Sequence, residues 1–319
     1  MNYSRPLDFE KDYLDLKFKL EELREYAVRK DLDLSAEIEA LESRMNTLKE
    51  ERYRHLKAWQ KYQLARHQDR PLTLEYIKAI FDDFIELHGD RCYGDDPAIV
   101  GGLAWLDDIP VTVLGHQKGK DTPQNIHRNF GMAHPEGYRK ACRLMRQAEK
   151  FKRPLICFVD TPGAYPGTGA EERGQGWAIA ETLAQMVSLR IPTLSLVIGE
   201  GGSGGALALG AADRVLMLSY AVYSVISPQG CASILWNDAS RSEEMAENLK
   251  MTAPDLLALG IIDEIVPEPL DGAHRDPEAV FRAVGERIRF HLRDLMQQDV
   301  LSRLERRYTR LREIGYYAD

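Results

Sequence analysis

The segment from Phe9 to about Arg66 is highly charged and carries its apolar residues at the spacing of a helix. Those apolar positions are Leu16, Leu20, Leu23, Ala27, Ile38, Leu41, Met45, Leu48, Leu56 and Trp59. The pattern is interrupted over residues 31–35, where Asp33 or Ser35 can cap a second helix. We therefore expect two long helices that form an antiparallel hairpin or a coiled-coil arm. Their narrow apolar stripe needs a partner surface, on the same chain or on another subunit.

After Arg70 and Pro71 the pattern changes to short apolar runs that alternate with glycine-rich turns and amphipathic segments. This alternation is typical of an α/β domain. We expect strands over Ala98–Trp105, Pro110–Gly115, Leu155–Asp160, Thr193–Ile198, Arg214–Met217 and Ala221–Ile226. We expect helices over Thr73–Leu87, Pro135–Lys150, Gly169–Leu189, Gly204–Ala211 and Ala253–Leu259, and a charged C-terminal helix system from Pro277 to about Glu313. The chain then divides into a helical arm over residues 1–70 and an α/β domain over residues 71–319.

The composition predicts a soluble globular protein. Of its 319 residues 44% are hydrophobic and 29% are charged, and the formal net charge is −8. No uninterrupted apolar run approaches the ~20 residues that a membrane span needs, and the negative charge argues against bulk attraction to nucleic acid or anionic lipid. The first residues lack both the apolar core of a signal peptide and the Ser/Arg-rich character of a transit peptide. We expect a cytoplasmic protein with no membrane partner.

The cysteines give no sign of a metal site. Cys92, Cys142, Cys157 and Cys231 are scattered, without any Cys-x-x-Cys pair. Neither a zinc ribbon nor a disulfide framework is indicated. We expect reduced, structural thiols and no metal in this chain.

The glycines of Ile198–Ala206, which reads IGEGGSGGA, lie between an apolar run and a helix of small residues. Glycine lets the backbone approach a ligand closely, and the first turn of a helix presents unpaired N–H groups at the positive end of its dipole. We therefore expect the run Gly201–Gly205 to hold an anionic oxygen. The alternative is that these glycines only permit close packing of helix on strand.

The same run also matches G-x-S-x-G, with Ser203 at the position of a nucleophile. Asp263 and His274 follow in the chain order of α/β-hydrolases, so a serine hydrolase remains an alternative. A P-loop is not indicated, because no Gly-Lys-Ser/Thr follows the glycines. A third alternative is a noncatalytic scaffold that uses the helical arm.

A second candidate loop follows the expected strand that ends at Asp160. It reads DTPGAYPGTGAEERG, and Gly163 and Ala164 are its candidate amide donors. Farther upstream, His116 and Lys118 follow another strand, and more basic residues recur at His127, Arg128, Arg139, Lys140 and Arg143. These side chains could receive phosphates or a carboxylate, although a charged cluster is more often a solvated face.

Several of these segments together resemble the alpha subunit of the multi-subunit bacterial acetyl-coenzyme A carboxylase carboxyltransferase. The resemblance covers nearly the whole chain. It rests on LARH (Leu64–His67), GDR (Gly89–Arg91), AIVGGLA (Ala98–Ala104), GHQKG (Gly115–Gly119), RNFGM (Arg128–Met132), PEGYRKA (Pro135–Ala141), DTPGAYPG (Asp160–Gly167), AEERGQ (Ala170–Gln175), GEGGSGGALALG (Gly199–Gly210), SVISP (Ser224–Pro228), GCASILW (Gly230–Trp236) and PEPLDGAHRDP (Pro267–Pro277). One departure is Gln229, where the family usually has Glu, and this puts in doubt any role for a carboxylate there.

The resemblance implies a crotonase-like fold built from ββα units, with an N-terminal helical hairpin. It also implies an alpha2beta2 complex with a zinc-ribbon beta subunit, in which the active site lies between the two kinds of subunit. Within that complex a carboxyl group moves from carboxybiotin, tethered to the biotin carboxyl carrier protein, to acetyl-CoA. The product is malonyl-CoA for fatty acid synthesis, and a separate biotin carboxylase consumes the ATP.

The resemblance also assigns roles to individual residues. The amides of Gly204 and Gly205 are implied to form the oxyanion hole for the ureido oxygen of biotin. Gly163, Ala164, Gly201, Gly202, Ser203, His116 and Lys118 are expected to bind substrate. Biotin itself accepts the proton in the family's scheme, so this chain need not supply a general base.

Overall fold

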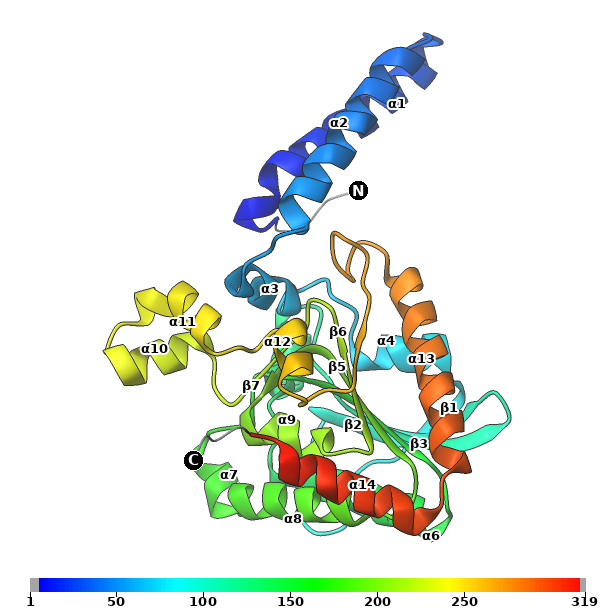
Figure 1. Ribbon diagram of the computed structural model, residues 1–319, viewed down its shortest axis with the longest axis vertical. Coiled ribbons are helices and arrows are strands. Elements are labelled where there is room, and N and C mark those ends of the chain that lie inside the picture. The colour runs from blue at the N-terminus through cyan, green and yellow to red at the C-terminus, as the bar shows by residue number, and fades with distance from the viewer. Residues whose placement is uncertain (1–5, 316–319) are drawn as a thin grey trace.

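The computed structural model describes residues 6–315, and its N-terminal part is a helical hairpin that extends away from the body (Figure 1). A short 3₁₀ turn (Asp8–Glu10) leads into α1 (Lys11–Lys30), and α2 (Ser35–Tyr53) returns beside it. α1 ends at Asp31, whose left-handed backbone (φ 51°) reverses the chain. Asp33 then accepts hydrogen bonds from the amide and hydroxyl of Ser35 at the start of α2. The predicted hairpin is confirmed.

The base of this hairpin is anchored to the body by a small cluster of apolar and paired polar side chains. Tyr13, Tyr53, Leu64 and Tyr220 belong to one buried apolar cluster. The hydroxyl of Tyr13 donates to Asp271, 2.9 Å away. The buried base thus supplies the partner surface that the apolar stripe needs, while the far end of the hairpin extends from the body.

The third N-terminal helix, α3 (Ala58–Ala65), packs on the body rather than extending α2. It contacts α11 (Ser242–Asn248) and β5 (Thr193–Gly202). Its first amide donates to Glu247, at 2.8 Å. The projecting arm therefore consists of α1 and α2, and the part of the predicted 1–70 unit that contains α3 packs with the body.

The body is built around one mixed β-sheet. Its order is β1-β2-β3-β4-β5-β6-β8, with β7 also paired to β5. β1 (Asp82–Glu86), β2 (Ile99–Leu106) and β3 (Ile109–His116) pair antiparallel, whereas β3, β4 (Leu155–Thr161), β5, β6 (Arg214–Leu218) and β8 (Glu264–Val266) are parallel neighbours. The short β7 (Val222–Ser224) pairs with the last residues of β5. The carboxyl ends of β3, β4 and β5 therefore meet at one edge, which is the usual place for a ligand in such a sheet.

Helices cover both faces of this sheet (Figure 1). One layer contains α6 (Pro135–Lys150), α8 (Gln175–Ser188) and α9 (Ser203–Gly210), which contact one another in turn and pack on β2 to β5. The other contains α4 (Thr73–Ile80) and α13 (Pro277–Gln297). Most buried apolar side chains form a single core between the layers. The remaining helices are α5 (Thr122–His127), α7 (Thr168–Glu172), α10 (Pro228–Trp236), α12 (Ala253–Ala258) and α14 (Val300–Glu313), with 3₁₀ turns at Asn129–Gly131 and Ala239–Arg241. The predicted α/β class is confirmed.

Two predicted helices are shorter than expected, each for a local reason. The helix expected over Thr73–Leu87 ends at Ile80, and the rest forms β1 on the edge of the sheet. Gly102 permits that pairing, because a Cβ there would lie 2.1 Å from the carbonyl oxygen of Ile85. The helix expected over Gly169–Leu189 is divided at Gly174, whose φ of +79° is left-handed.

Arginines attach the last helix, α14, to the body. The guanidinium of Arg307 donates to the carbonyls of Met186 and Leu189 at the end of α8, at 3.1 and 2.9 Å, and pairs with Asp213 at 2.7 Å. Carbonyls at the end of a helix lack the amide one turn further on, and that of Met186 accepts a long hydrogen bond of 3.5 Å from the amide of Leu189. The buried arginine satisfies them and holds α14 across the end of α8.

Candidate active site

The glycine turn, Gly201–Gly205, connects β5 to α9 at the carboxyl edge of the sheet. Helix α9 begins at Ser203 and has no side-chain cap on its first turn among the described residues. Ser203 is exposed, with a left-handed φ of 54°, and Gly204 is half-buried beside it. Because the first amides of a helix have no acceptor within it, this turn offers N–H donors at the positive end of α9.

The proline loop, Asp160–Gly167, follows β4 and keeps its shape through side chains. The hydroxyl of Thr161 donates to the carbonyl of Gly163 at 2.7 Å and accepts from its amide at 3.1 Å. Farther along, the side-chain amide of Gln175 donates to the carbonyl of Tyr165 at 2.9 Å. A Cβ at Gly163 would meet no atom within 4 Å, so this residue faces open space.

The two loops pack directly against each other. Thr161 pairs with Gly201 in the sheet. A Cβ at Gly202 would lie 2.1 Å from the carbonyl oxygen of Pro162, and a Cβ at Gly205 would lie 2.8 Å from the amide nitrogen of Ala164. The structure thus brings together Gly163, Ala164 and all five residues of the glycine turn, which the sequence had placed in separate motifs.

Two buried polar side chains lie beneath the glycine turn. His116 is fully buried at the end of β3, and burial lowers the pKa of its imidazole to about 3, although nearby backbone groups of Gly205 and Phe158 partly oppose that shift. The hydroxyl of Tyr138 on α6 would lie 2.7 Å from a Cβ at Gly205. Within residues 6–315 neither the ring nitrogens of His116 nor this hydroxyl has a hydrogen-bond partner. His116 is neutral at pH 7 and cannot touch a bound ligand in this conformation.

Lys118, which follows β3, is held by two carboxylates. Its ammonium lies 2.8 Å from Asp160 at the end of β4 and 2.7 Å from Glu200 near the end of β5. Burial alone would lower the pKa of Lys118, but the charges of Asp160 and Glu200 outweigh it and raise the pKa. The ammonium of Lys118, which is expected from the sequence to bind substrate, therefore pairs with two carboxylates of the same chain. The sequence offered no sign of this pairing, because the three residues are far apart in it.

A small cavity of about 30 Å³ borders the glycine turn on the side of α3 and α10. Its lining includes Tyr62, Arg66, Glu200 and Gly202. The hydroxyl of Tyr62 donates to the side-chain oxygen of Gln229 at 3.2 Å. Gln229, the residue that departs from the family pattern, is thus bonded to a side chain that lines this cavity.

The serine hydrolase is excluded because its three residues do not form a triad. Asp263 is bonded to Arg214, Arg310 and the amide of Val215. His274 stacks instead on His67, with ring centroids 4.1 Å apart, and burial lowers its pKa to about 2. Without a His–Asp pair, Ser203 lacks the oriented base that such a nucleophile needs.

The downstream basic cluster supports the fold instead of facing a ligand. Arg139 pairs with Asp90 at 2.8 Å, and the buried Lys140 pairs with Asp95 at 2.6 Å. Arg143 donates to the carbonyl of Gly89 at 3.0 Å. These contacts fix the loop before β2, so the solvated or structural interpretation of this cluster applies.

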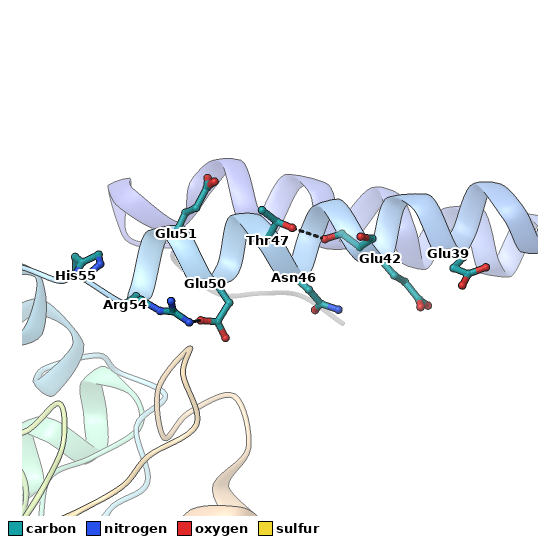
Figure 2. A pocket seen from close by; sticks show the side chains of 9 residues that line it. Glu39, Glu42, Asn46, Thr47, Glu50, Glu51, Arg54 and His55 are labelled. Atoms are coloured by element: carbon teal, nitrogen blue, oxygen red, sulfur yellow. Dashed lines mark hydrogen bonds and ion pairs between the residues drawn. The ribbon is translucent and has the colours of Figure 1, made fainter.

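A groove on the helical hairpin lies outside this site. It is open, has a volume of about 840 Å³ and follows α2 (Figure 2), where it is lined by Glu39, Glu42, Ser43, Asn46, Thr47, Glu50, Glu51, Arg54 and His55. All of these side chains come from one polar helix face and its end. In the described part of the chain, no group of three His, Cys, Asp or Glu side chains could hold a metal ion. Nor does any helix there have the length and apolarity of a membrane span.

Solved structures show the same fold. The chain resembles a Pseudomonas malonate decarboxylase hetero-tetramer in complex with coenzyme A, with 22% identity and a TM-score of 0.55 over 69% of this chain and 90% of that one. It also resembles the transcarboxylase 12S core, with 23% identity and a TM-score of 0.52 over 65% and 40% of the two chains. The predicted crotonase-like carboxyltransferase fold is confirmed.

Closer relatives define the family. The family model described as acetyl co-enzyme A carboxylase carboxyltransferase-like matches residues 6–315. The acetyl-coenzyme A carboxylase carboxyl transferase subunit alpha of Halalkalibacterium halodurans is 56% identical, over 99% of this chain and 97% of its own. That of a Listeria monocytogenes strain is 54% identical, over 98% of both. The chain belongs to this family of alpha subunits, and its activity is the carboxyl transfer that forms malonyl-CoA within a multi-subunit acetyl-CoA carboxylase.

Proposed function

We propose that this chain supplies the biotin side of a carboxyltransferase site that lies between an alpha and a beta subunit. The observation that carries the proposal is the glycine turn, whose first helical turn has no side-chain cap among the described residues, is exposed at Ser203 and packs on the proline loop at Gly205. Such a turn suits an oxygen that becomes negative during the reaction. Bound carboxybiotin, tethered to a carrier protein, would supply the carboxyl group and the ureido oxygen on which that charge collects.

The amides of Gly204 and Gly205 are the donors to that oxygen. They belong to the first turn of α9, so the helix dipole adds to their effect. Because the turn is already in place, the donors need no reorganisation as charge develops, and removing one such donor typically costs about 10²–10³ in rate. Gly205 is buried, and its backbone packs closely against Tyr138 and Ala164.

The neighbouring backbone lines the place where substrate binds. Gly201 and Gly202 continue β5 toward the small cavity, and Gly163 faces open space beside Ala164. Ser203 serves as an exposed spacer between the two pairs of glycines. His116 supports the turn from beneath rather than binding substrate, because its side chain is fully buried.

The rest of the site comes from a zinc-ribbon beta subunit in an alpha2beta2 complex. Large apolar side chains stand exposed around the glycine turn: Trp177 on α8, Leu207 on α9 and Val225 after β7, exposed by 77%, 42% and 76%. α8 packs on α9, and β7 pairs with Gly202, so all three side chains come from elements around the turn. Exposed apolar side chains gathered around a catalytic turn support a protein partner that covers them.

The other components follow from the same assignment. Acetyl-CoA accepts the carboxyl group to give malonyl-CoA for fatty acid synthesis, and a biotin carboxylase loads the biotin carboxyl carrier protein beforehand. This chain therefore carries neither the biotin nor a metal of its own. We place the complex in the cytoplasm.

Reconstitution tests this proposal. The purified chain is mixed with its beta subunit, and malonyl-CoA-dependent carboxylation of free biotin is measured. We expect turnover only when both subunits are present. Turnover by either subunit alone would contradict the shared site. A fluorophosphonate should fail to label Ser203, because its hydroxyl has no triad to activate it.

A further inference from the structure

Three neighbouring strands end with charged side chains that meet behind the glycine turn. Lys118 follows β3, Asp160 lies near the end of β4, and Glu200 lies near the end of β5. The lysine side chain is 16% exposed, and the two carboxylates are 5% and 8% exposed. Asp160 begins the proline loop and Glu200 directly precedes the glycine turn, so one ammonium joins the bases of both loops.

The contacts among Lys118, Asp160 and Glu200, which we call the junction, leave these side chains little freedom to move. Asp160 accepts from the amide of Glu200 at 3.1 Å, so its carboxylate binds the backbone of β5 as well as the ammonium. A Cβ at Gly199 would lie 2.4 Å from that carboxylate, and a Cβ at Gly131 would lie 2.8 Å from Cγ of Lys118. The lysine stem and the carboxylate therefore fill spaces that only glycine leaves open.

The charges at the junction balance. Glu200 has a second cationic neighbour, Arg66, at 3.4 Å, so two cations face two carboxylates. Removing the ammonium would leave Asp160 and Glu200 as like charges close together in a poorly solvated place, and such charges repel each other strongly. The expected response is a separation of the ends of β4 and β5.

We propose that Lys118 is a positioning residue that joins the proline loop to the glycine turn, and thereby sets the amides of Gly204 and Gly205 relative to Gly163 and Ala164. This inference rests on the proposed function of those amides. It assigns the ammonium to Asp160 and Glu200 and not to substrate. Since an error of about 1 Å at a site can cost about 10²-fold in rate, a displaced junction should lower turnover without removing any group that binds CoA.

The test compares Lys118→Met with Lys140→Met in the reconstituted alpha–beta complex. Lys140 is a matched control, because it is also a buried lysine that pairs with a carboxylate, but its partner Asp95 belongs to neither loop of the candidate site. For Lys118→Met we expect kcat to fall at least tenfold while the KM for malonyl-CoA changes less than twofold. Lys118→Arg, which keeps the charge, should recover part of the kcat. For Lys140→Met we expect kcat and KM near the wild-type values.

Hydrogen–deuterium exchange supplies a readout that does not depend on turnover. In Lys118→Met the peptides covering residues 160–167 and 199–206 should exchange faster, because the junction no longer holds them. In Lys140→Met these peptides should exchange as in the wild type. If Lys118→Met does not fold, Lys118→Arg carries the test, with a smaller loss of kcat, an unchanged KM and faster exchange in the same peptides.

Two results would overturn the inference. One is a tenfold rise in the KM for malonyl-CoA with kcat unchanged, which would make Lys118 a substrate ligand. The other is normal kcat and normal exchange in Lys118→Met. Both differ from failure of the proposed function itself, in which the wild-type complex would show no malonyl-CoA-dependent transfer.

Discussion

The proline loop and the glycine turn follow neighbouring parallel strands, yet they keep their shapes by opposite means. Side-chain hydrogen bonds hold the proline loop, chiefly those between the hydroxyl of Thr161 and the backbone of Gly163. The glycine turn depends on missing side chains, because a Cβ at Gly202 or Gly205 would collide with the proline loop. The first loop is therefore weakened by removing a polar atom, and the second is broken by adding a carbon.

This difference matters for how the candidate site could work. A turn whose backbone faces the ligand has its donors in place before the reaction begins, and no side chain has to reorient. The proline loop acts as a brace, since Ala164 and Pro162 contact the glycine turn directly. The following changes test this division of roles, from the largest expected effect to the smallest.

Adding a carbon to the glycine turn should have the largest effect. In Gly205→Val the new Cβ would lie 2.7 Å from the hydroxyl of Tyr138 and 2.8 Å from the amide of Ala164, so the two loops must separate. We expect carboxyl transfer by the reconstituted complex to fall by about 10²-fold or more. As a control, Gly176→Ala on α8 adds a Cβ with no atom within 4 Å and should retain full activity. Wild-type turnover by Gly205→Val would refute the assignment of its amide.

Removing a polar atom from the proline loop should have an intermediate effect. Thr161→Val keeps the shape of the side chain but deletes its two bonds to Gly163. A hydrogen bond of this kind contributes about 1 kcal/mol net, which corresponds to roughly fivefold in rate, so we expect kcat to fall by roughly fivefold as the loop loses its shape. Thr161→Ser keeps the hydroxyl and should stay near wild type. If both variants lose activity equally, the methyl group and not the hydroxyl holds the loop.

Acid should destabilise the support beneath the glycine turn. The pKa of His116 is about 3 in the folded chain and about 6.5 in the unfolded chain, so the unfolded chain binds the additional proton as the pH falls below 6.5. The free energy of unfolding should therefore decrease by about 1.4 kcal/mol from this residue between pH 7.5 and pH 5.5. Urea titrations at the two pH values measure the change. His116→Phe should remove this part of the pH dependence, and an unchanged dependence would contradict the burial of a neutral histidine.

Truncating the one side chain of the glycine turn should have the smallest effect. Ser203 is exposed and has no triad, so Ser203→Ala should retain activity within about twofold when its backbone amide is unchanged. Steady-state transfer measures this directly. A loss above tenfold would mean that the hydroxyl itself takes part, contrary to its role as a spacer.

Much of the fold could be predicted from local pattern. Strand β4 begins with a continuous apolar run and helix α6 has strong helical periodicity, and the predicted bounds of both agree closely with the structure. β1 could not be found this way, because Asp82–Glu86 becomes a strand only through pairing with β2. The break at Gly174 was also missed, since glycine is tolerated in a helix and its left-handed φ depends on the surrounding chain.

The candidate site likewise contains some residues that the local sequence identifies and others whose contacts depend on the fold. Gly204 and Gly205 were recognisable because glycine between a strand and a helix has a direct backbone consequence. Lys118 was selected for its charge, but its partners Asp160 and Glu200 depend on which strands become neighbours. His116 was selected on the same grounds, and its burial depends on the layer of helices above β3.

The sequence by itself determined the α/β class, the helical hairpin and the two glycine-containing loops, because each is encoded by residues close together in the chain. Only the tertiary structure decided that these loops touch, that one lysine joins them and that Ser203 has no triad. Those facts depend on distances between residues far apart in sequence. These distances become short only when the strands have taken their order in the sheet. The packed core then excludes water from the paired charges of Lys118, Asp160 and Glu200.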